Sequence, residues 1–246
     1  MPTMKLLYQT HSPYARKVLV AAYEMGLHQS LTVIHHETSP TRRNAEVFAL
    51  NPLGKVPVLI CDDGTVLFDS NVICEYLDGL HPGLPLIPSQ PQPHFRALKM
   101  QALAQGIADA GITARWESDR RPAELRWPVM HDGQIAKIAA ACDFLEQELD
   151  TQQTGTFAMT VGAGPGTAAG RVALGNLAGD SRDTEAASPD WCPDIGDIAL
   201  VTALSWVEFR HVYDFLTGRP RLAHWYATLC ARPSMLATTL EGQTHD

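Results

Sequence analysis

Five prolines lie between His81 and Pro93 and divide this chain of 246 residues into two parts with different hydrophobic patterns. Proline fixes φ and lacks a backbone N–H, so prolines at this density stiffen a connection and prevent a helix from continuing through it. Strand and helix patterns alternate before this segment, and only helix patterns follow it. The pattern predicts an α/β domain over residues 1–81, a linker over 82–93 and an all-helical domain over 94–246.

Before the prolines, the elements follow the order of a small mixed sheet with helices on its faces. Alternating β-branched runs predict strands, apolar residues at three- and four-residue spacing predict helices, and Asp63-Gly64 between two apolar runs predicts a hairpin. The expected elements are a strand over 5–9, a helix over 14–25, a strand over 31–35, a short helix over 41–50, strands over 56–61 and 65–68, and a helix over 69–80.

After the prolines, helix patterns cover residues 95–117, 123–149, 195–212 and 221–230. Between the second and third of these, an insertion at about 154–190 is rich in Gly, Ala, Ser and Thr and lacks apolar periodicity. We expect it either to pair as a small hairpin or to be mobile. Its GxG steps have no following Lys-Ser/Thr and no clear strand-to-helix context, so they do not indicate a nucleotide-binding loop.

The formal net charge of −8 argues against a nucleic-acid backbone or an anionic membrane as the main partner, because both attract dense positive charge. The N-terminus lacks the layout of a signal peptide, and no apolar run is long enough to cross a bilayer. The five cysteines are scattered, with no CxxC pair and no histidine at metal-ligand spacing. We therefore expect a cytoplasmic protein without a metal, its thiols packed as small hydrophobic groups.

The segment from His11 to Tyr14 lies between the first expected strand and the first expected helix. Proline is favoured in the first turn of a helix, so Pro13 places Ser12 at or beside the helix N-terminus. Free N–H groups and the helix dipole favour a negative charge there, and a serine hydroxyl is able to donate to a sulfur anion. The alternative is that Ser12 serves only as an N-cap.

Two further motifs suit an extended peptide with charged ends. Val56-Pro57 leads into an apolar strand, a typical place for a cis bond that leaves the N–H and C=O of Val56 free for a ligand backbone; an ordinary turn into an edge strand is the alternative. Ser70, expected as the N-cap of the third helix, presents its hydroxyl and the helix N–H groups to a carboxylate. Asp69 beside it suits an ammonium group, and an N-cap alone would not explain the pair.

These motifs, SPYARK from Ser12, NPLGKVP from Asn51 and FDS from Phe68, resemble the glutathione-binding half of bacterial glutathione transferases. The similarity returns at Asp194, where the sequence resembles the capping box of that family's sixth helix. It covers essentially the whole chain except the insertion at 154–190. Each motif is weak alone, whereas their order and spacing together are specific.

The resemblance implies a thioredoxin-like N-terminal domain followed by an all-α domain, assembled as a homodimer. It implies that glutathione is bound by Ser12, Lys55, Val56, Pro57, Asp69 and Ser70. In that arrangement Ser12 stabilises the thiolate, and Val56 beside cis-Pro57 pairs with the cysteinyl backbone. Asp69 and Ser70 hold the γ-glutamyl end, and Lys55 lies near one of the carboxylates.

The chain departs from the family pattern at the first helix. In several serine-type classes the catalytic serine aligns with His11, whereas in cysteine-type members the cysteine aligns with Ser12. A serine there argues against thiol exchange, because a hydroxyl cannot form a mixed disulfide. Whether Ser12, His11 or Thr10 faces the sulfur stays open at this stage, and Ser12 is the preferred candidate.

The second substrate's pocket is expected against the first helix of the helical domain, where Asp109, Thr113 and Trp116 share one face. A helix-packing face is the alternative for each of them. The leading hypothesis is a detoxifying enzyme that conjugates glutathione to a small hydrophobic electrophile. A non-catalytic binding module of the same fold and a glutathione-dependent isomerase or peroxidase are the alternatives.

Overall fold

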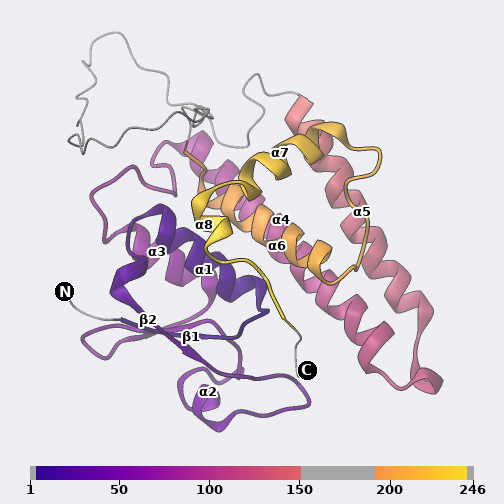
Figure 1. Cartoon of the computed structure of the whole chain (residues 1–246), viewed down its shortest axis with the longest axis horizontal. Coiled ribbons are helices and arrows are strands. Elements are labelled where there is room, and N and C mark those ends of the chain that lie inside the picture. The colour runs from indigo at the N-terminus through magenta and orange to yellow at the C-terminus, as the bar shows by residue number, and fades with distance from the viewer. Residues whose placement is uncertain (1–3, 151–191, 243–246) are drawn as a thin grey trace, which may run out of the picture.

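The computed structural model describes residues 4–150 and 192–242, and the hairpin or mobile segment expected within 154–190 lies outside these ranges. A four-stranded mixed sheet with the strand order β2-β1-β3-β4 forms the N-terminal part, with helices on its faces (Figure 1). β1 pairs parallel with β2 and antiparallel with β3, so that Leu6 lies opposite Val33 and Leu59. The predicted thioredoxin-like sheet domain is thereby confirmed.

The elements of the sheet domain start and end close to the predicted positions. They are β1 (Met4–Tyr8), α1 (Pro13–Glu24), a 3₁₀ turn (His28–Ser30), β2 (Leu31–His35), α2 (Ala45–Leu50), β3 (Val58–Ile60), β4 (Val66–Leu67) and α3 (Ser70–Asp78).

Two helix starts in this domain differ from the sequence prediction. α2 begins at Ala45 instead of residue 41, because the Asn44 side chain accepts from the next backbone N–H groups as an N-cap. The N-cap of α3 is Asp69, whose Oδ1 accepts from the Asn71 N–H at 3.0 Å. The expectation that Ser70 is the cap was therefore wrong, since Ser70 is the first helical residue.

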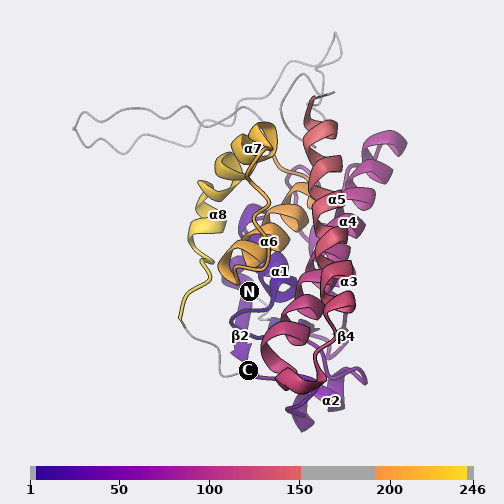
Figure 2. The same ribbon diagram turned by 90° about the vertical axis from the view of Figure 1, so that its right-hand side faces the viewer.

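All regular elements among the described residues of the second part are helical, as predicted. Its elements are α4 (Pro91–Arg115), a π-helical turn (Trp116–Arg120), a 3₁₀ turn (Ala123–Leu125), α5 (Pro128–Asp150), α6 (Ile195–Phe209), α7 (Pro220–Cys230) and α8 (Pro233–Leu236). α4 begins inside the segment predicted as a linker, because prolines are tolerated in a first helical turn. α4 and α5 run side by side as a long hairpin (Figure 1 and Figure 2).

α6 lies at the centre of the helical region and is buried along nearly its whole length. Its first turn is closed by the predicted capping box, in which Asp194 and Asp197 each accept a hydrogen bond from the other's backbone N–H. α6 contacts α4 closely at two glycines: Gly196 lies against Met100, and Gly111 lies against Trp206. The second contact lies further along the chain than the first on both helices. α4 and α6 therefore run parallel.

Buried polar contacts join the sheet domain to the helical region. Arg16 of α1 donates to the hydroxyl of Ser205 at 2.5 Å and to the carbonyl of Met235 at 3.2 Å. Glu24, at the other end of α1, accepts two hydrogen bonds from Arg232, at 2.7 and 2.8 Å. Because these partners belong to α6 and the α8 region, α1 is fixed against both.

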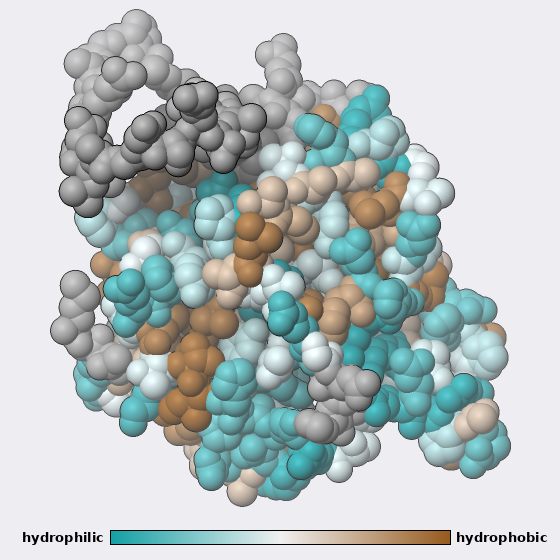
Figure 3. All heavy atoms as spheres, viewed as in Figure 1, coloured by the Kyte–Doolittle hydropathy of each residue, from teal (hydrophilic) through white to brown (hydrophobic). Residues whose placement is uncertain are grey.

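Figure 3 shows hydrophilic and hydrophobic side chains interspersed over one face of the molecule. Among the described residues, no helix is both long enough and apolar enough to cross a bilayer.

Candidate functional site

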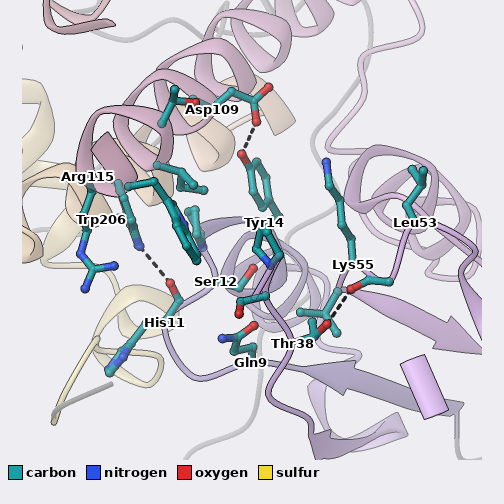
Figure 4. Close-up of a pocket in the computed structure, with 18 of the residues that line it drawn as sticks. Gln9, His11, Ser12, Tyr14, Thr38, Leu53, Lys55, Asp109, Arg115 and Trp206 are labelled. Atoms are coloured by element: carbon teal, nitrogen blue, oxygen red, sulfur yellow. Dashed lines mark hydrogen bonds between the residues drawn. The ribbon is translucent and has the colours of Figure 1, made fainter. Parts of the chain in front are cut away.

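A cavity of about 890 Å³ lies between the sheet domain and the helical region (Figure 4). We call it the interdomain cavity. It is lined by residues from four stretches of the chain, namely 9–14, 38–56, 109–116 and 206–210. The N-terminus of α1 therefore faces a space bounded by loops of the sheet domain on one side and by α4 and α6 on the other.

Ser12 is half-buried on the wall of this cavity and is the N-cap of α1. Its Oγ accepts a hydrogen bond from the Ala15 N–H at 3.2 Å. The bond uses the oxygen as an acceptor, so the hydroxyl hydrogen is left for a second partner. The helix N-terminus behind it carries a partial positive charge. Ser12 is thus able to cap α1 through its oxygen and to donate its hydroxyl hydrogen to a ligand at the same time.

The two residues before Ser12 have other contacts. Thr10 is exposed, does not line the cavity and pairs through its hydroxyl with Nδ1 of His35 at 3.3 Å. His11 lines the cavity, but its Nε2 lies 2.6 Å from the carbonyl oxygen of Glu241. The backbone carbonyl of His11 accepts from the indole N–H of Trp206 at 2.9 Å, as Figure 4 shows.

Tyr14 connects the two walls of the cavity. Its hydroxyl donates to the carboxylate of Asp109 on α4 (Figure 4). Burial, followed by the hydrogen bond and charge of Asp109 and the charge of Asp69, raises the pKa of Tyr14 well above its usual 10.0. Asp109, Thr113 and Trp116, the three residues expected on one pocket face, all line the cavity.

The loop before β3 forms the opposite wall. The bond between Val56 and Pro57 is cis, as the sequence indicated. Val56 is buried and lines the cavity, and its N–H and C=O make no hydrogen bond within the described residues. The loop is held by the hydroxyl of Thr38, which donates to the Gly54 carbonyl at 2.8 Å. The exposed Lys55 also lines the cavity.

Asp69, Ser70 and Pro57 do not belong to the lining of the cavity. Asp69 is exposed, and its charge acts on Tyr14 and Lys17, which places it near the Tyr14 side of the cavity. The hydroxyl of Ser70 is buried and has no hydrogen-bond partner among the described residues. The predicted residues thus divide into a set on the cavity wall and a pair beside it.

Sequence reasoning missed the number of cations in the cavity. Arg43, Lys55, Arg115 and Arg210 line it, whereas Asp109 is its one carboxylate among the described residues. The signal for Arg115 was its position on the helix, beside the expected pocket residue at 116.

Reactive thiols are absent from the cavity lining, although all five cysteines fall in the described ranges. Burial raises the pKa of Cys74 to about 11 and that of Cys142 to about 12. The prediction that the thiols pack as small hydrophobic groups was wrong for Cys192, which is exposed. No group of three or more metal-ligating side chains occurs among the residues that the structure describes.

Comparison with known proteins assigns relatives to both parts of the chain. The family model described as Glutathione S-transferase, N-terminal domain matches residues 11–80. The crystal structure of a glutathione transferase family member from Pseudomonas fluorescens Pf-5 with bound glutathione is similar, with a TM-score of 0.77 and 33% sequence identity. That match covers 98% of this chain and 100% of the other.

Two curated proteins extend over most of the chain. An uncharacterized GST-like protein of Escherichia coli (strain K12), YibF, is 33% identical over 193 residues, covering 78% of this chain and 88% of that protein. A maleylacetoacetate isomerase of Pseudomonas aeruginosa is 27% identical over 239 residues, covering 90% of this chain and 95% of the isomerase.

Proposed function

Because this chain belongs to the glutathione S-transferase family, we propose that it binds glutathione in the interdomain cavity and transfers the thiolate to a small electrophile. The observation that carries the proposal is that Ser12 and Val56 line one cavity, and that the backbone of Val56 makes no hydrogen bond among the described residues. One offers a donor to a sulfur anion, and the other offers a donor and an acceptor to an extended peptide.

The proposed role of Ser12 is to stabilise the thiolate of glutathione. The hydroxyl donates to the sulfur while its oxygen still caps α1, and the positive end of α1 adds a second favourable interaction. Both effects favour the anion over the thiol and lower the pKa of the bound thiol. Thr10 is a weaker candidate, because it lies outside the cavity lining and its hydroxyl pairs with His35. His11 is a weaker candidate, because its Nε2 lies against the carbonyl of Glu241, and its Nδ1 is buried without a partner among the described residues.

The backbone of the tripeptide is proposed to pair with Val56 beside cis-Pro57. Asp69 and Ser70 suit the γ-glutamyl end: one offers a carboxylate to the ammonium, and the other a buried hydroxyl and the start of α3 to the carboxylate. The exposed Lys55 suits a carboxylate of glutathione. The chemistry is then a displacement in which the sulfur forms a bond to carbon and a leaving group departs with its electron pair.

A glutathione-dependent isomerase is the second candidate, and the similarity to a maleylacetoacetate isomerase over nearly the whole chain favours it. It would use the same thiolate, which adds to a double bond and is later expelled. A non-catalytic binding module of the same fold is a third reading. We also propose that the protein is a homodimer, that it is located in the cytoplasm and that its role is detoxification. The exposed apolar side chains of Val72, Tyr76 and Phe95 are suited to a contact between the two subunits.

The proposal is tested by titrating the purified protein with glutathione in a calorimeter and by measuring conjugation of chlorodinitrobenzene. Saturable heat together with turnover supports a transferase. Saturable heat with turnover of a cis double-bonded substrate, and none of the aryl halide, supports the isomerase. Heat without any turnover supports a binding module. Absence of heat at millimolar glutathione contradicts both the transferase and the isomerase.

A further inference from the structure

The interdomain cavity is more positive than a pocket for an uncharged electrophile requires. Among the described residues, four basic side chains and one carboxylate line it, in a chain whose net charge is −8. A concentration of one sign in a low-dielectric cavity, opposite to the sign of the whole protein, favours ligands of the other sign. Glutathione accounts for part of this charge, since it has a carboxylate at each end.

The cations lie on opposite sides of Ser12. Figure 4 shows Lys55 and Leu53 on one side of Ser12 and Tyr14, and Arg115 and Trp206 on the other. The Lys55 side is the one that contains the backbone of Val56, where the tripeptide is proposed to bind. The Arg115 side, next to the helical region, is therefore available for the second substrate, which reacts with the sulfur.

The parallel packing of α4 and α6 brings Arg115 and Arg210 to the same end of the helix pair. Gly111 contacts Trp206, and each arginine follows its contact residue by four positions, which is about one helical turn. Both arginines line the cavity. Two arginines from two helices therefore line the cavity at the same end of the helix pair.

Structural roles account for these arginines only in part. Cations are favoured at helix C-termini, which explains a positive charge at this end but not a position inside a cavity. Nε of Arg115 is 3.6 Å from Oδ2 of Asp119, longer than a hydrogen bond, and the Arg115 side chain is only 13% exposed. Because this ion pair with Asp119 is made by Nε, the two terminal nitrogens of Arg115 make no hydrogen bond among the described residues and retain donors for an anionic ligand.

Flat apolar surface adjoins the two cations. Trp116 and Trp206 also line the cavity. Trp116 directly follows Arg115 in the sequence, and Trp206 lies one helical turn before Arg210. We propose that the second substrate is an anionic electrophile, with a flat unsaturated body against these tryptophans and a carboxylate bound by Arg115 and Arg210. This inference rests on the proposed glutathione-binding function and narrows its substrate from a hydrophobic electrophile to a carboxylate-bearing one.

The test compares three ligands by calorimetry: glutathione, S-benzylglutathione and S-(4-carboxybenzyl)glutathione. The two conjugates differ only in one carboxylate, so the ratio of their affinities isolates its contribution. We expect the carboxylated conjugate to bind about tenfold more tightly, as for a hydrogen-bonded charged group. Arg115→Met and Arg210→Met should each reduce this ratio several-fold. Arg126→Met removes the same charge from an exposed position outside the cavity and should leave the ratio unchanged.

Each outcome separates this inference from the function on which it rests. If glutathione and both conjugates fail to bind, the proposed function is wrong and the inference falls with it. If the conjugates bind with equal affinity, glutathione binding stands and the anionic substrate is excluded. If the ratio persists in both cavity variants, glutathione binding stands and the assignment of the carboxylate to Arg115 and Arg210 is wrong. If Arg126→Met lowers the ratio as much as the cavity variants, the preference arises from overall charge and the assigned site is wrong.

Discussion

The hydroxyl of Tyr14 donates to the carboxylate of Asp109 across the interdomain cavity, which joins α1 of the sheet domain to α4 of the helical region. This contact fixes the width of the cavity next to Ser12, the N-cap of the same helix. In the proposed function, the position of the glutathione sulfur relative to the second substrate depends on this bond, which neither substrate makes.

Tyr14→Phe should destabilise the protein by about 1 kcal/mol, because the phenyl ring keeps the packing and loses the hydrogen bond. The effect should depend on pH. Burial and Asp109 raise the pKa of Tyr14 in the folded state, so its contribution is present below the ordinary pKa of 10.0 and is lost as the pH rises above it. Urea unfolding of both proteins at about pH 8 and about pH 11 measures this difference, which should shrink at the higher pH. Equal stability of the two proteins at both pH values would contradict the account.

Ser12 should affect turnover and stability separately. Ser12→Ala removes both the cap and the hydroxyl and should cost about 1 kcal/mol, whereas Ser12→Gly should cost only a few tenths. Both should lower conjugation of an aryl halide by about tenfold to a hundredfold, because both remove the donor to the sulfur. Thr10→Val is the control and should retain turnover, since the Thr10 hydroxyl pairs with His35. Loss of turnover in Thr10→Val, with Ser12→Gly unaffected, would move the donor role to Thr10.

Gly111 and Gly106 on α4 provide a matched pair for the packing against α6. A Cβ at Gly111 would lie 2.9 Å from Cζ3 of Trp206, whereas a Cβ at Gly106 meets nothing within 4 Å. Gly111→Ala should therefore cost about 1–3 kcal/mol through overpacking. Gly106→Ala should stabilise by about 0.5–1 kcal/mol through its better helix propensity. Thermal unfolding distinguishes them, and an equal change in both variants would contradict the close approach of the helices.

Glu24 should stabilise the contact between α1 and the α8 region in a pH-dependent way. Burial raises its pKa, but hydrogen bonds from Arg232 and Ser234 outweigh this effect and leave the pKa lowered. Its contribution is therefore present above the ordinary value of 4.5 and is lost as the pH falls through the folded-state value.

Glu24→Gln should accordingly cost about 2 kcal/mol at neutral pH, and the difference from the wild type should close under acid conditions. Glu37→Gln is the control, because its ion pair with Arg42 is exposed and should contribute less than about 1 kcal/mol. Unfolding by urea across the acid range measures both. A cost for Glu24→Gln that does not change with pH would contradict the role of the carboxylate charge.

The order of elements was predictable from local patterns, whereas exact helix starts were not. Periodicity and the Asp-Gly turn predicted the four strands of the described residues and the long helices. The start of α3 was misassigned because Asp69 and Ser70 are both good N-cap residues. In the structure Asp69 has the extended backbone of an N-cap, and its side chain accepts from the Asn71 N–H. α4 began early because a proline that stops one helix is also suited to start the next.

The site was predictable where it follows a local motif, and not where it depends on tertiary packing. Ser12 and the cis bond before Pro57 are set by a few neighbouring residues, so their patterns were readable. The placement of Arg115 and Arg210 on the same cavity depends on the parallel packing of α4 against α6. Residues separated by nearly a hundred positions carry no local signal of such a contact.

The most direct test of the central claim is the ionisation of glutathione bound to the protein. The ultraviolet absorbance of the thiolate, followed against pH in the presence of saturating protein, gives the pKa of the bound thiol. We predict a value at least about one unit below the free thiol value of about 8.5, with much of that shift lost in Ser12→Gly. A bound thiol that titrates like free glutathione, in the wild type as in the variant, would contradict the account.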